Sequence, residues 1–427
     1  MLDIKLIREN PELVRENLKK KFQEERLPLV DEVISLDAEL RNIQAEGDKL
    51  RAQRNASSKE IGKLMKEKKK KEAEDKKEAV KLIGKKLNEL EKGLESKQER
   101  YQEIMFTLPN IIGDSVPIGK DDGDNVVIEK HGEPRKVDFE IPYHADIMEN
   151  LGGLDLESAR KTSGNGFYYL MGDVARLHSA VISYAREFMI SKGFTYCIPP
   201  FMIREKVVSG VMSFEEMDSM MYKIEGEDLY LIGTSEHSTI GKYMNTIIEK
   251  ETLPQTITSF SPCFRKEVGA HGIEERGVFR VHQFEKQEMV VLCEPEESME
   301  WFDKLYKYSV ELFLSLDIPV QVLECCSGDL ADLKKKSVDI EAYSPRQKKY
   351  FEVCSASNLG DAQSRRLKIR VDGENGNYYP HTLNNTVVAP PRMLIAFFEN
   401  NVNKDGSVNI PEALRPYMGN QSVIKPK

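Results

Sequence analysis

The chain has 427 residues and a mass of 48.8 kDa, which is long for one domain and indicates two or three. Apolar residues make up 40%, enough for a sizeable core, and the charged fraction of 31% exceeds the usual quarter. The net charge of −9 gives no reason by itself to expect a nucleic-acid partner. Residues 51–100, however, hold 17 Lys and Arg against 10 Asp and Glu, so a basic segment adjoins an acidic remainder.

Several protein classes are excluded early. No apolar run approaches the roughly 18 residues that a membrane helix needs, and the N-terminus lacks the apolar core of a signal peptide. We therefore expect a cytoplasmic protein. The six cysteines form no CxxC pair, which argues against a disulfide scaffold. Buried thiols are the favoured interpretation; a zinc site built from Cys325, Cys326, Cys354 and a histidine is a minor alternative, because adjacent cysteines chelate poorly.

Two N-terminal stretches repeat apolar residues at steps of 3 and 4, the spacing of a coiled-coil seam. The first spans residues 33–64 and the second residues 80–104. Residues 65–79 between them are lysine-rich and carry no apolar stripe, so we expect a linker there and an antiparallel helical hairpin. The first seam is poor at Gly47 and Arg54, which predicts a bendable arm at that point.

Pro109 should end the second helix, because proline lacks an N–H and disfavours helix in the residue before it. From about residue 113 onward, short β-type runs alternate with helical stretches and are separated by long insertions. The sequence therefore predicts an α+β protein with two domains. Residues 1–112 would form an antiparallel α-helical coiled-coil arm, and residues 113–427 a domain on a mainly antiparallel β-sheet.

The basic arm has two interpretations. A lysine-rich coiled-coil face is commonly just solvated, whereas lysines near a polyanion release counterions and contribute affinity for nucleic acid. Aromatic residues for base stacking are nearly absent from residues 24–100. If the arm binds nucleic acid, it should therefore read backbone shape rather than bases. The candidates for such contacts are the lysines between the two helices: Lys68, Lys69, Lys70 and Lys71.

A glycine-interrupted segment in the second half of the chain concentrates charge around an aromatic residue. Arg265 and Glu267 are two apart in an expected strand and should share one face. Arg280, Phe284 and Glu288 follow at every fourth position of a second expected strand, again on one face. Two arginines, a ring and two carboxylates could hold a nucleotide, because arginine suits phosphate by charge and fork geometry. A surface ion-pair lattice on a hairpin is the alternative.

Motif-like stretches follow one another along nearly the whole chain. They are LPNI (108–111), SGNGFYYL (163–170), KGFTYCIPPFM (192–202), LYLIGTSEH (229–237), FRKE and RGVFRVHQFEKQE (within 264–288), YFEVCSASNLGDAQSRR (350–366) and HTLNNTVVAPPRMLIAFFEN (381–400). In this order they resemble the seryl-tRNA synthetases, a family of class II aminoacyl-tRNA synthetases. The resemblance implies a class II synthetase-type catalytic domain that forms seryl-adenylate from serine and ATP and then transfers the seryl group to the 3′ end of tRNA.

The same resemblance implies an ATP site. The residues that would bind ATP are Arg265, Glu267, Arg280, Phe284, Glu352, Ser355 and Arg392. We expect the three arginines to be catalytic, because the transition state gathers charge on phosphate. Phe284 would stack on adenine with Arg392 opposite. Glu352 and Ser355 would hold Mg²⁺, which prefers hard oxygen ligands.

A serine site is implied in the same way. The residues that would bind serine are Thr234, Ser235, Glu236, Glu288 and Thr386. Glu288 and Thr386 would meet the serine hydroxyl. Alanine would leave both groups unpaired, at a cost of about 1–3 kcal/mol for each group.

The resemblance also implies partners: a serine tRNA held by the arm and a second copy of the chain, since KGFTYCIPPFM looks like the dimer-forming motif. It leaves open whether a selenocysteine tRNA is also charged. One departure is VVAPPR, which lacks the glycines that precede this arginine in many class II enzymes. We expect Pro390 and Pro391 to act instead as a rigid start to a helix near Met393.

Three other functions are alternatives. A paralogue that charges a carrier protein would give the basic arm no purpose. A non-catalytic RNA-binding regulator should have lost Arg265, Glu288, Glu352 or Arg392, and all four are present. A coiled-coil protein with a globular head predicts no ATP chemistry that depends on an amino acid.

Overall fold

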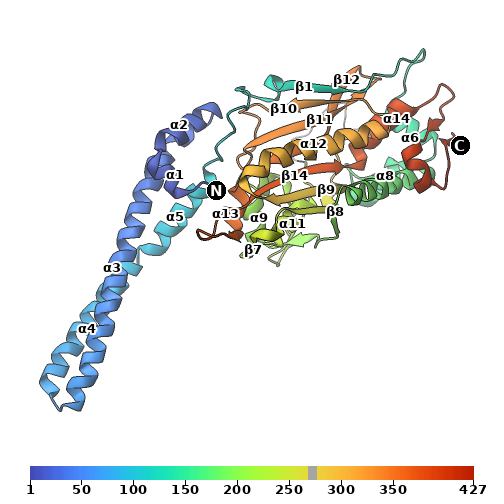
Figure 1. Cartoon of the computed structure of the whole chain (residues 1–427). Coiled ribbons are helices and arrows are strands. Elements are labelled where there is room, and N and C mark those ends of the chain that lie inside the picture. The colour runs from blue at the N-terminus through green and yellow to red at the C-terminus, as the bar shows by residue number, and fades with distance from the viewer. Residues whose placement is uncertain (268–276) are drawn as a thin grey trace. The chain divides into compact units, whose positions relative to one another are not determined.

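The computed structural model describes residues 1–267 and 277–427 and divides into two compact units (Figure 1). Leu2–Pro109 form one unit, and Met1 together with Asn110–Lys427 forms the other. The break falls three residues before the expected boundary at residue 112. Within the described ranges, no helix is long and apolar enough to cross a membrane.

The first unit is a long helical hairpin. It begins with the short helices α1 (Ile4–Glu9) and α2 (Pro11–Lys20), which lead into the 40-residue helix α3 (Leu27–Lys66). The chain returns alongside α3 through α4 (Lys70–Glu91) and α5 (Leu94–Thr107), as the blue elements of Figure 1 show. At about 1.5 Å per residue, α3 is roughly 60 Å long.

Ion pairs fix the antiparallel register of this hairpin. The pairs that join α3 to the returning helices are Glu32–Arg100 (2.7 Å), Glu39–Lys97, Arg51–Glu91 (3.3 Å) and Glu60–Lys76 (2.5 Å). The residue number of the partner falls as the number in α3 rises, which is the signature of antiparallel helices. Val33 and Leu50 of α3 and Leu87 of α4 are buried, so the expected apolar seam is also formed.

Two details of the arm differ from the expectation. The predicted linker at 65–79 is wrong for most of its length, because α3 ends at Lys66 and α4 already begins at Lys70. Lysine, glutamate and alanine are good helix formers even without an apolar stripe, so this stretch is helical. The helix α3 runs unbroken past Gly47 and Arg54, and the interruption lies at Gly93 in the returning half, where glycine lowers helix propensity.

The second unit is built on an eight-stranded sheet with the strand order β1-β10-β11-β12-β14-β9-β8-β4. The strands are β1 (Val126–His131), β4 (Thr195–Cys197), β8 (Gln255–Phe264), β9 (Gln283–Cys293), β10 (Val320–Glu324), β11 (Lys336–Ser344), β12 (Lys349–Asn358) and β14 (His381–Val388). All neighbours are antiparallel except the β4–β8 pair. The predicted α+β fold on a mainly antiparallel sheet is confirmed.

Helices pack against this sheet through two separate cores. The long helices α8 (Gly172–Ser191), α12 (Ser298–Ser315) and α14 (Pro390–Asn401) bury the larger core. Alternate residues of β9 divide between the cores: Met289 and Val291 enter the larger one, and Val290 and Leu292 enter the smaller one beside α11 (Ser235–Gly241). Because a strand alternates its faces, the even-numbered residues of β9 all lie on the α11 side.

The charged segment around residues 264–288 is less regular than predicted. β8 ends at Phe264 and β9 begins only at Gln283, so Arg265, Glu267 and Arg280 lie outside the strands. Glu267 has a φ of 46°, a left-handed conformation that turns the chain out of the strand. Residues 268–276 of the segment lie outside the described residues. Within the motif LYLIGTSEH (229–237), only Tyr230–Leu231 forms a strand, β6, which is outside the main sheet.

Candidate active site

A cavity of about 310 Å³ opens on the α11 side of the sheet. It collects side chains from the end of β8, from β9, β12 and β14, and from the starts of α11 and α14. The predicted site residues that line it are Thr234, Glu236, Arg265, Glu267, Phe284, Glu288, Glu352, Ser355, Thr386 and Arg392. Residues from four distant stretches of sequence therefore meet in one place.

Strand β9 supplies the floor of the cavity. Phe284, Lys286 and Glu288 are two residues apart and point to the same side. Glu288 lies directly opposite Thr386 in the β9–β14 ladder, so the two residues expected to meet the serine hydroxyl are cross-strand neighbours. Lys286 was missed by the sequence reasoning, although the two-residue period of a strand places it between Phe284 and Glu288.

The carboxylate of Glu288 is buried and charge-paired. Its Oε2 lies 2.6 Å from Nζ of Lys286 and accepts a hydrogen bond of 3.2 Å from the hydroxyl of Thr234. Both members of the ion pair are less than a tenth exposed. A buried carboxylate needs such partners, because an unpaired charge away from water is costly. Among the described residues, Oε1 accepts no hydrogen bond, so this oxygen is available to a ligand.

Two arginines lie over aromatic rings at the other end of the cavity. Arg265 Nε donates to the carbonyl of Gly233 at 3.2 Å, and its guanidinium lies 5.3 Å from the ring centre of Phe284. Arg392 lies over Phe279 at 4.9 Å, a ring that the sequence reasoning did not single out. These contacts hold two cationic groups at the cavity wall in defined orientations.

A bulge in β12 brings Glu352 and Ser355 to the same cavity. In a regular strand, residues three apart point to opposite faces. The register of β12 against β11 shifts here, because Cys354 pairs with Ile340 while Glu352 already pairs with Glu341. The extra residue is Val353, and both Glu352 and Ser355 line the cavity.

The carboxylate of Glu352 is shared with neighbouring polar groups. Its Oε2 accepts a hydrogen bond of 2.8 Å from Nη1 of Arg392. Asp339 lies opposite Ser355 in the ladder and is hydrogen-bonded to it, and burial together with the charge of Glu352 raises the pKa of Asp339 to about 6. A carboxylate and a hydroxyl facing a cavity, with a second carboxyl behind them, form a hard oxygen donor set that fits Mg²⁺.

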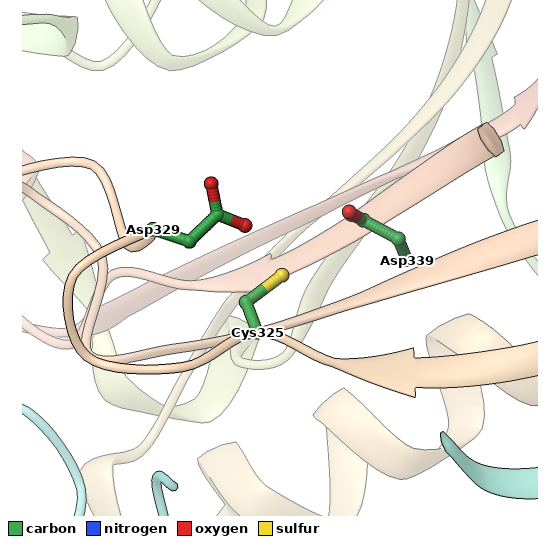
Figure 2. A group of neighbouring side chains, drawn as sticks. All are labelled: Cys325, Asp329 and Asp339. Atoms are coloured by element: carbon green, nitrogen blue, oxygen red, sulfur yellow. The ribbon is translucent and has the colours of Figure 1, made fainter. Parts of the chain in front are cut away.

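Asp339 also belongs to a cluster of potential metal ligands, which Figure 2 shows. Cys325, Asp329 and Asp339 converge there, with their potential ligand atoms within 4.8 Å of one another. Burial raises the pKa of the Cys325 thiol, which disfavours the thiolate that a zinc ion needs.

The minor alternative of a cysteine-based zinc site is not supported. Cys326 Sγ donates to the carbonyl of Asp121 at 3.2 Å, and Cys354 Sγ donates to the carbonyl of Val387 at 3.7 Å. The thiols of Cys325, Cys326 and Cys354 therefore have different surroundings. All six cysteines are unbridged and five of them are buried, as the favoured interpretation predicted.

Glu236 lines the cavity and is hydrogen-bonded to two residues, Thr234 and Gln363. Its backbone N–H donates to the hydroxyl of Thr234, which caps the start of α11. Its Oε1 accepts a hydrogen bond of 2.7 Å from the side chain of Gln363. Burial and the nearby charge of Glu288 raise the pKa of Glu236 to about 7. The carboxyl therefore titrates close to neutral pH.

Two predicted site residues do not line the cavity. Ser235 is fully buried, and its hydroxyl is bonded to the side chain and backbone of Ser259. Arg280 is half exposed and lies 3.6 Å from the carboxylate of Glu267, so it could act on the cavity only through that residue. The resemblance implies both residues, and the spacing of Arg280 from Phe284 also predicts a shared face, but neither side chain lines the cavity.

Comparison with known proteins gives a consistent result over the whole length. The Seryl-tRNA synthetase N-terminal domain matches residues 1–112, and the tRNA synthetase class II core domain (G, H, P, S and T) matches residues 220–401. The serine–tRNA ligase of Pyrococcus horikoshii is 43% identical over 99% of this chain and 98% of its own length. That of Methanocella arvoryzae is 41% identical over 98% and 99%.

Solved structures agree. The seryl-tRNA synthetase of Pyrococcus horikoshii complexed with ATP superposes with a TM-score of 0.92 at 41% identity and covers 100% of both chains. The cytoplasmic serine–tRNA ligase of Naegleria fowleri in complex with AMP has a TM-score of 0.87 at 34% identity, covering 100% of this chain and 99% of its own. Two domain matches in the family's order and full-length identity above 40% allow one conclusion: the chain belongs to the seryl-tRNA synthetase family.

Proposed function

We propose that the cavity joins L-serine to ATP and that the seryl group then passes to the 3′ end of tRNA. In the first step a serine carboxylate oxygen attacks the α-phosphorus, the bond to the β-phosphate breaks, and pyrophosphate leaves. In the second step the terminal ribose hydroxyl attacks the seryl carbonyl, and AMP leaves. The observation that carries the proposal is the cavity itself, in which a cationic aromatic end and a carboxylate-rich end share one wall.

The cationic end suits the nucleotide. Arg265 is fixed by the carbonyl of Gly233 and would neutralise charge developing on the α-phosphate. Phe284 offers a ring for adenine, and Glu267 would help position the nucleotide. Arg392 would reach the outer phosphates, and Arg280 would act through its ion pair with Glu267. Preorganised cations dominate this kind of chemistry, because phosphoryl transfer needs little covalent help.

Glu352 and Ser355 would hold Mg²⁺ together with phosphate oxygens. The ion would supply charge neutralisation to the polyphosphate. In the chain as described, Glu352 is paired with Arg392 at 2.8 Å. This arginine therefore has to exchange part of its contact with Glu352 for contact with phosphate when the nucleotide binds.

The carboxylate-rich end suits serine. Glu236, capped beside Thr234, would bind the substrate ammonium. Oε1 of Glu288 would accept a hydrogen bond from the serine hydroxyl, and Thr386 lies directly opposite as the second polar partner. Lys286 compensates the buried charge of Glu288, so that the carboxylate is available as an acceptor rather than as a proton donor.

The arm would hold the tRNA. Lys68 and Lys69 lie in the turn between α3 and α4, Lys70 and Lys71 begin α4, and the exposed side chains of all four would contact phosphate. A shape-reading arm suits a serine tRNA, because a long variable arm distinguishes that tRNA. The enzyme would act on it in the cytoplasm.

We also propose a two-fold symmetric homodimer. Light scattering should give about twice the mass of one chain, and a fully active monomer would contradict this.

The experiment that tests the function is pyrophosphate exchange across the twenty amino acids, followed by charging of total tRNA. Serine alone should support strong exchange, and only serine-accepting tRNA should become charged. Exchange with another amino acid, or exchange with serine but no charging of any tRNA, would reject the assignment. Transfer to a carrier protein in place of tRNA would favour the paralogue interpretation.

A further inference from the structure

We propose that Gln363 is a positioning residue for serine activation, because its carboxamide holds the Glu236 carboxyl in the orientation that binds the serine ammonium. Gln363 belongs to α13 (Ala362–Leu367) and is fully buried. It does not line the cavity but contacts Glu236 from behind. The proposal rests on the assignment of Glu236 to serine made above.

All hydrogen-bonding groups of the Gln363 carboxamide have partners. Nε2 donates to Oε1 of Glu236 at 2.7 Å and to the backbone carbonyl of Val211 at 3.3 Å. Oε1 accepts a hydrogen bond of 2.7 Å from the hydroxyl of Thr382. A primary carboxamide has two N–H donors and one carbonyl oxygen, so both donors and the oxygen are engaged here.

These partners also determine which end of the amide is nitrogen. A backbone carbonyl can only accept, so the end that faces Val211 has to carry the N–H groups. The other end is therefore oxygen, and the hydroxyl of Thr382 donates to it. Rotating the amide by 180° would place its oxygen against the carbonyl oxygen of Val211 and against Oε1 of Glu236. The orientation of Gln363 is consequently unique, and a donor always points at Glu236.

This donor occupies Oε1 of Glu236. Among the described residues, no group donates to Oε2, which is therefore the oxygen available to a ligand in the cavity. The charged groups around Glu236 are Glu288 and Lys286 from β9 and Lys334 from the segment before β11. Burial and Glu288 raise the pKa of Glu236, whereas the Gln363 hydrogen bond lowers it. Gln363 therefore favours the ionised carboxylate, which is the form that an ammonium group needs.

The test is a Gln363→Met variant, which keeps the length and apolar volume of the side chain and removes the donor. The KM for serine should rise about 10-fold or more, as expected for loss of a hydrogen bond to a charged group, while the KM for ATP stays unchanged. The acidic limb of kcat/KM for serine should move to higher pH, because Glu236 becomes harder to ionise. A residue with a merely structural role would not move that limb.

The chain offers a matched control. Gln321 of β10 donates a hydrogen bond of 2.6 Å to Glu341 of β11, so it is also a mostly buried Gln–Glu contact, and neither residue lines the cavity. Gln321→Met should leave the serine KM and the pH profile unchanged. Thr382→Val removes the donor to Oε1 of Gln363, so the carboxamide is held less firmly against Glu236, and the acidic limb should shift in the same direction by a smaller amount. It serves as the decisive variant if Gln363→Met does not fold.

Two failures can be told apart. If Glu236→Gln leaves the serine KM unchanged, the assignment of Glu236 to serine is wrong. If Glu236→Gln weakens serine binding but folded Gln363→Met, or Thr382→Val in its place, keeps the normal serine KM and acidic limb, the positioning role of Gln363 is wrong.

Discussion

An arginine–glutamate pair occurs in each unit, and the two pairs lie in different surroundings. In the arm, Arg100 and Glu32 form a forked contact at 2.7 and 2.9 Å, with both side chains 40% exposed. In the catalytic unit, Arg392 and Glu352 meet at 2.8 Å with exposures of 27% and 45%. The arm pair is one of a series that holds two helices in register. The second pair borders a cavity, where a ligand can replace either partner.

The distance between the charged atoms of an ion pair therefore does not show whether the pair binds a ligand. Water screens both pairs, so each adds little to stability and the two do not differ in this respect. What distinguishes Arg392 and Glu352 is that they meet Ser355 and Phe279 at a bulged strand and a helix start. We therefore expect variants of the arm and variants of the cavity to affect different activities.

Deletion of residues 36–100, with a short loop joining the helices, removes most of the arm. Seryl transfer to tRNA should fall by about 1000-fold or more, since several phosphate contacts are lost together. Serine-dependent pyrophosphate exchange should remain largely intact, because every residue that lines the cavity lies beyond residue 210. Exchange and aminoacylation assays on the same preparation measure both quantities. Normal charging would mean that the arm is a spacer or serves another partner.

Arg392→Ala removes the cavity arginine. Exchange should slow by at least about 100-fold, as loss of a charged transition-state contact typically does. The matched control is Arg100→Ala, which removes the arm arginine from a similarly exposed pair. We expect it to leave exchange within about twofold of the unchanged chain, in line with the small value of exposed pairs. Equal losses in both variants, with the fold verified by thermal melting, would overturn the comparison.

Thr386→Val keeps the shape of the side chain opposite Glu288 and removes its hydroxyl. Serine activation should weaken by about 10-fold, while alanine should improve relative to serine, because one polar partner no longer favours the hydroxyl. Exchange rates with the two amino acids give the ratio. An unchanged ratio would show that Thr386 does not face the substrate side chain.

Changing Lys68, Lys69, Lys70 and Lys71 together to serine alters the turn of the arm and the first two residues of α4. Affinity for tRNA should fall modestly, by about 10-fold or less at physiological salt. Its dependence on salt should flatten, because each lost phosphate contact lowers the slope of log affinity against log salt by about one. Titrations at several salt concentrations measure the slope. The same slope before and after the change would place these lysines away from phosphate.

Much of the fold could be predicted because its signals are periodic. The arm follows from apolar steps of 3 and 4, and the strands β8, β9 and β12 follow from short β-type runs. The same two-residue period also places Lys286 on the face that Phe284 and Glu288 share. The prediction of a linker at 65–79 failed because a missing apolar stripe does not prevent a helix of good helix formers.

Other parts of the site have no local signal. The bulge at Val353 depends on how β12 pairs with β11, and only that pairing lets Glu352 and Ser355 face one cavity. The separation of Arg265, Glu267 and Arg280 from the strands depends on where β8 and β9 stop pairing. Ser235 and Glu236 are neighbours in the chain, but the first turn of α11 directs one to Ser259 and the other to the cavity.

The family and the residue types of the site can be predicted from the chain alone, because both depend on residue types in a fixed order. Which of those residues meet depends on how the distant segments pack. Gln363 is the clearest case: its partners Glu236, Val211 and Thr382 lie 127, 152 and 19 residues away along the chain. A hydrogen-bond network of that kind arises when sheet and helices pack together, since the energy of a buried polar group depends on neighbours that sequence spacing does not reveal.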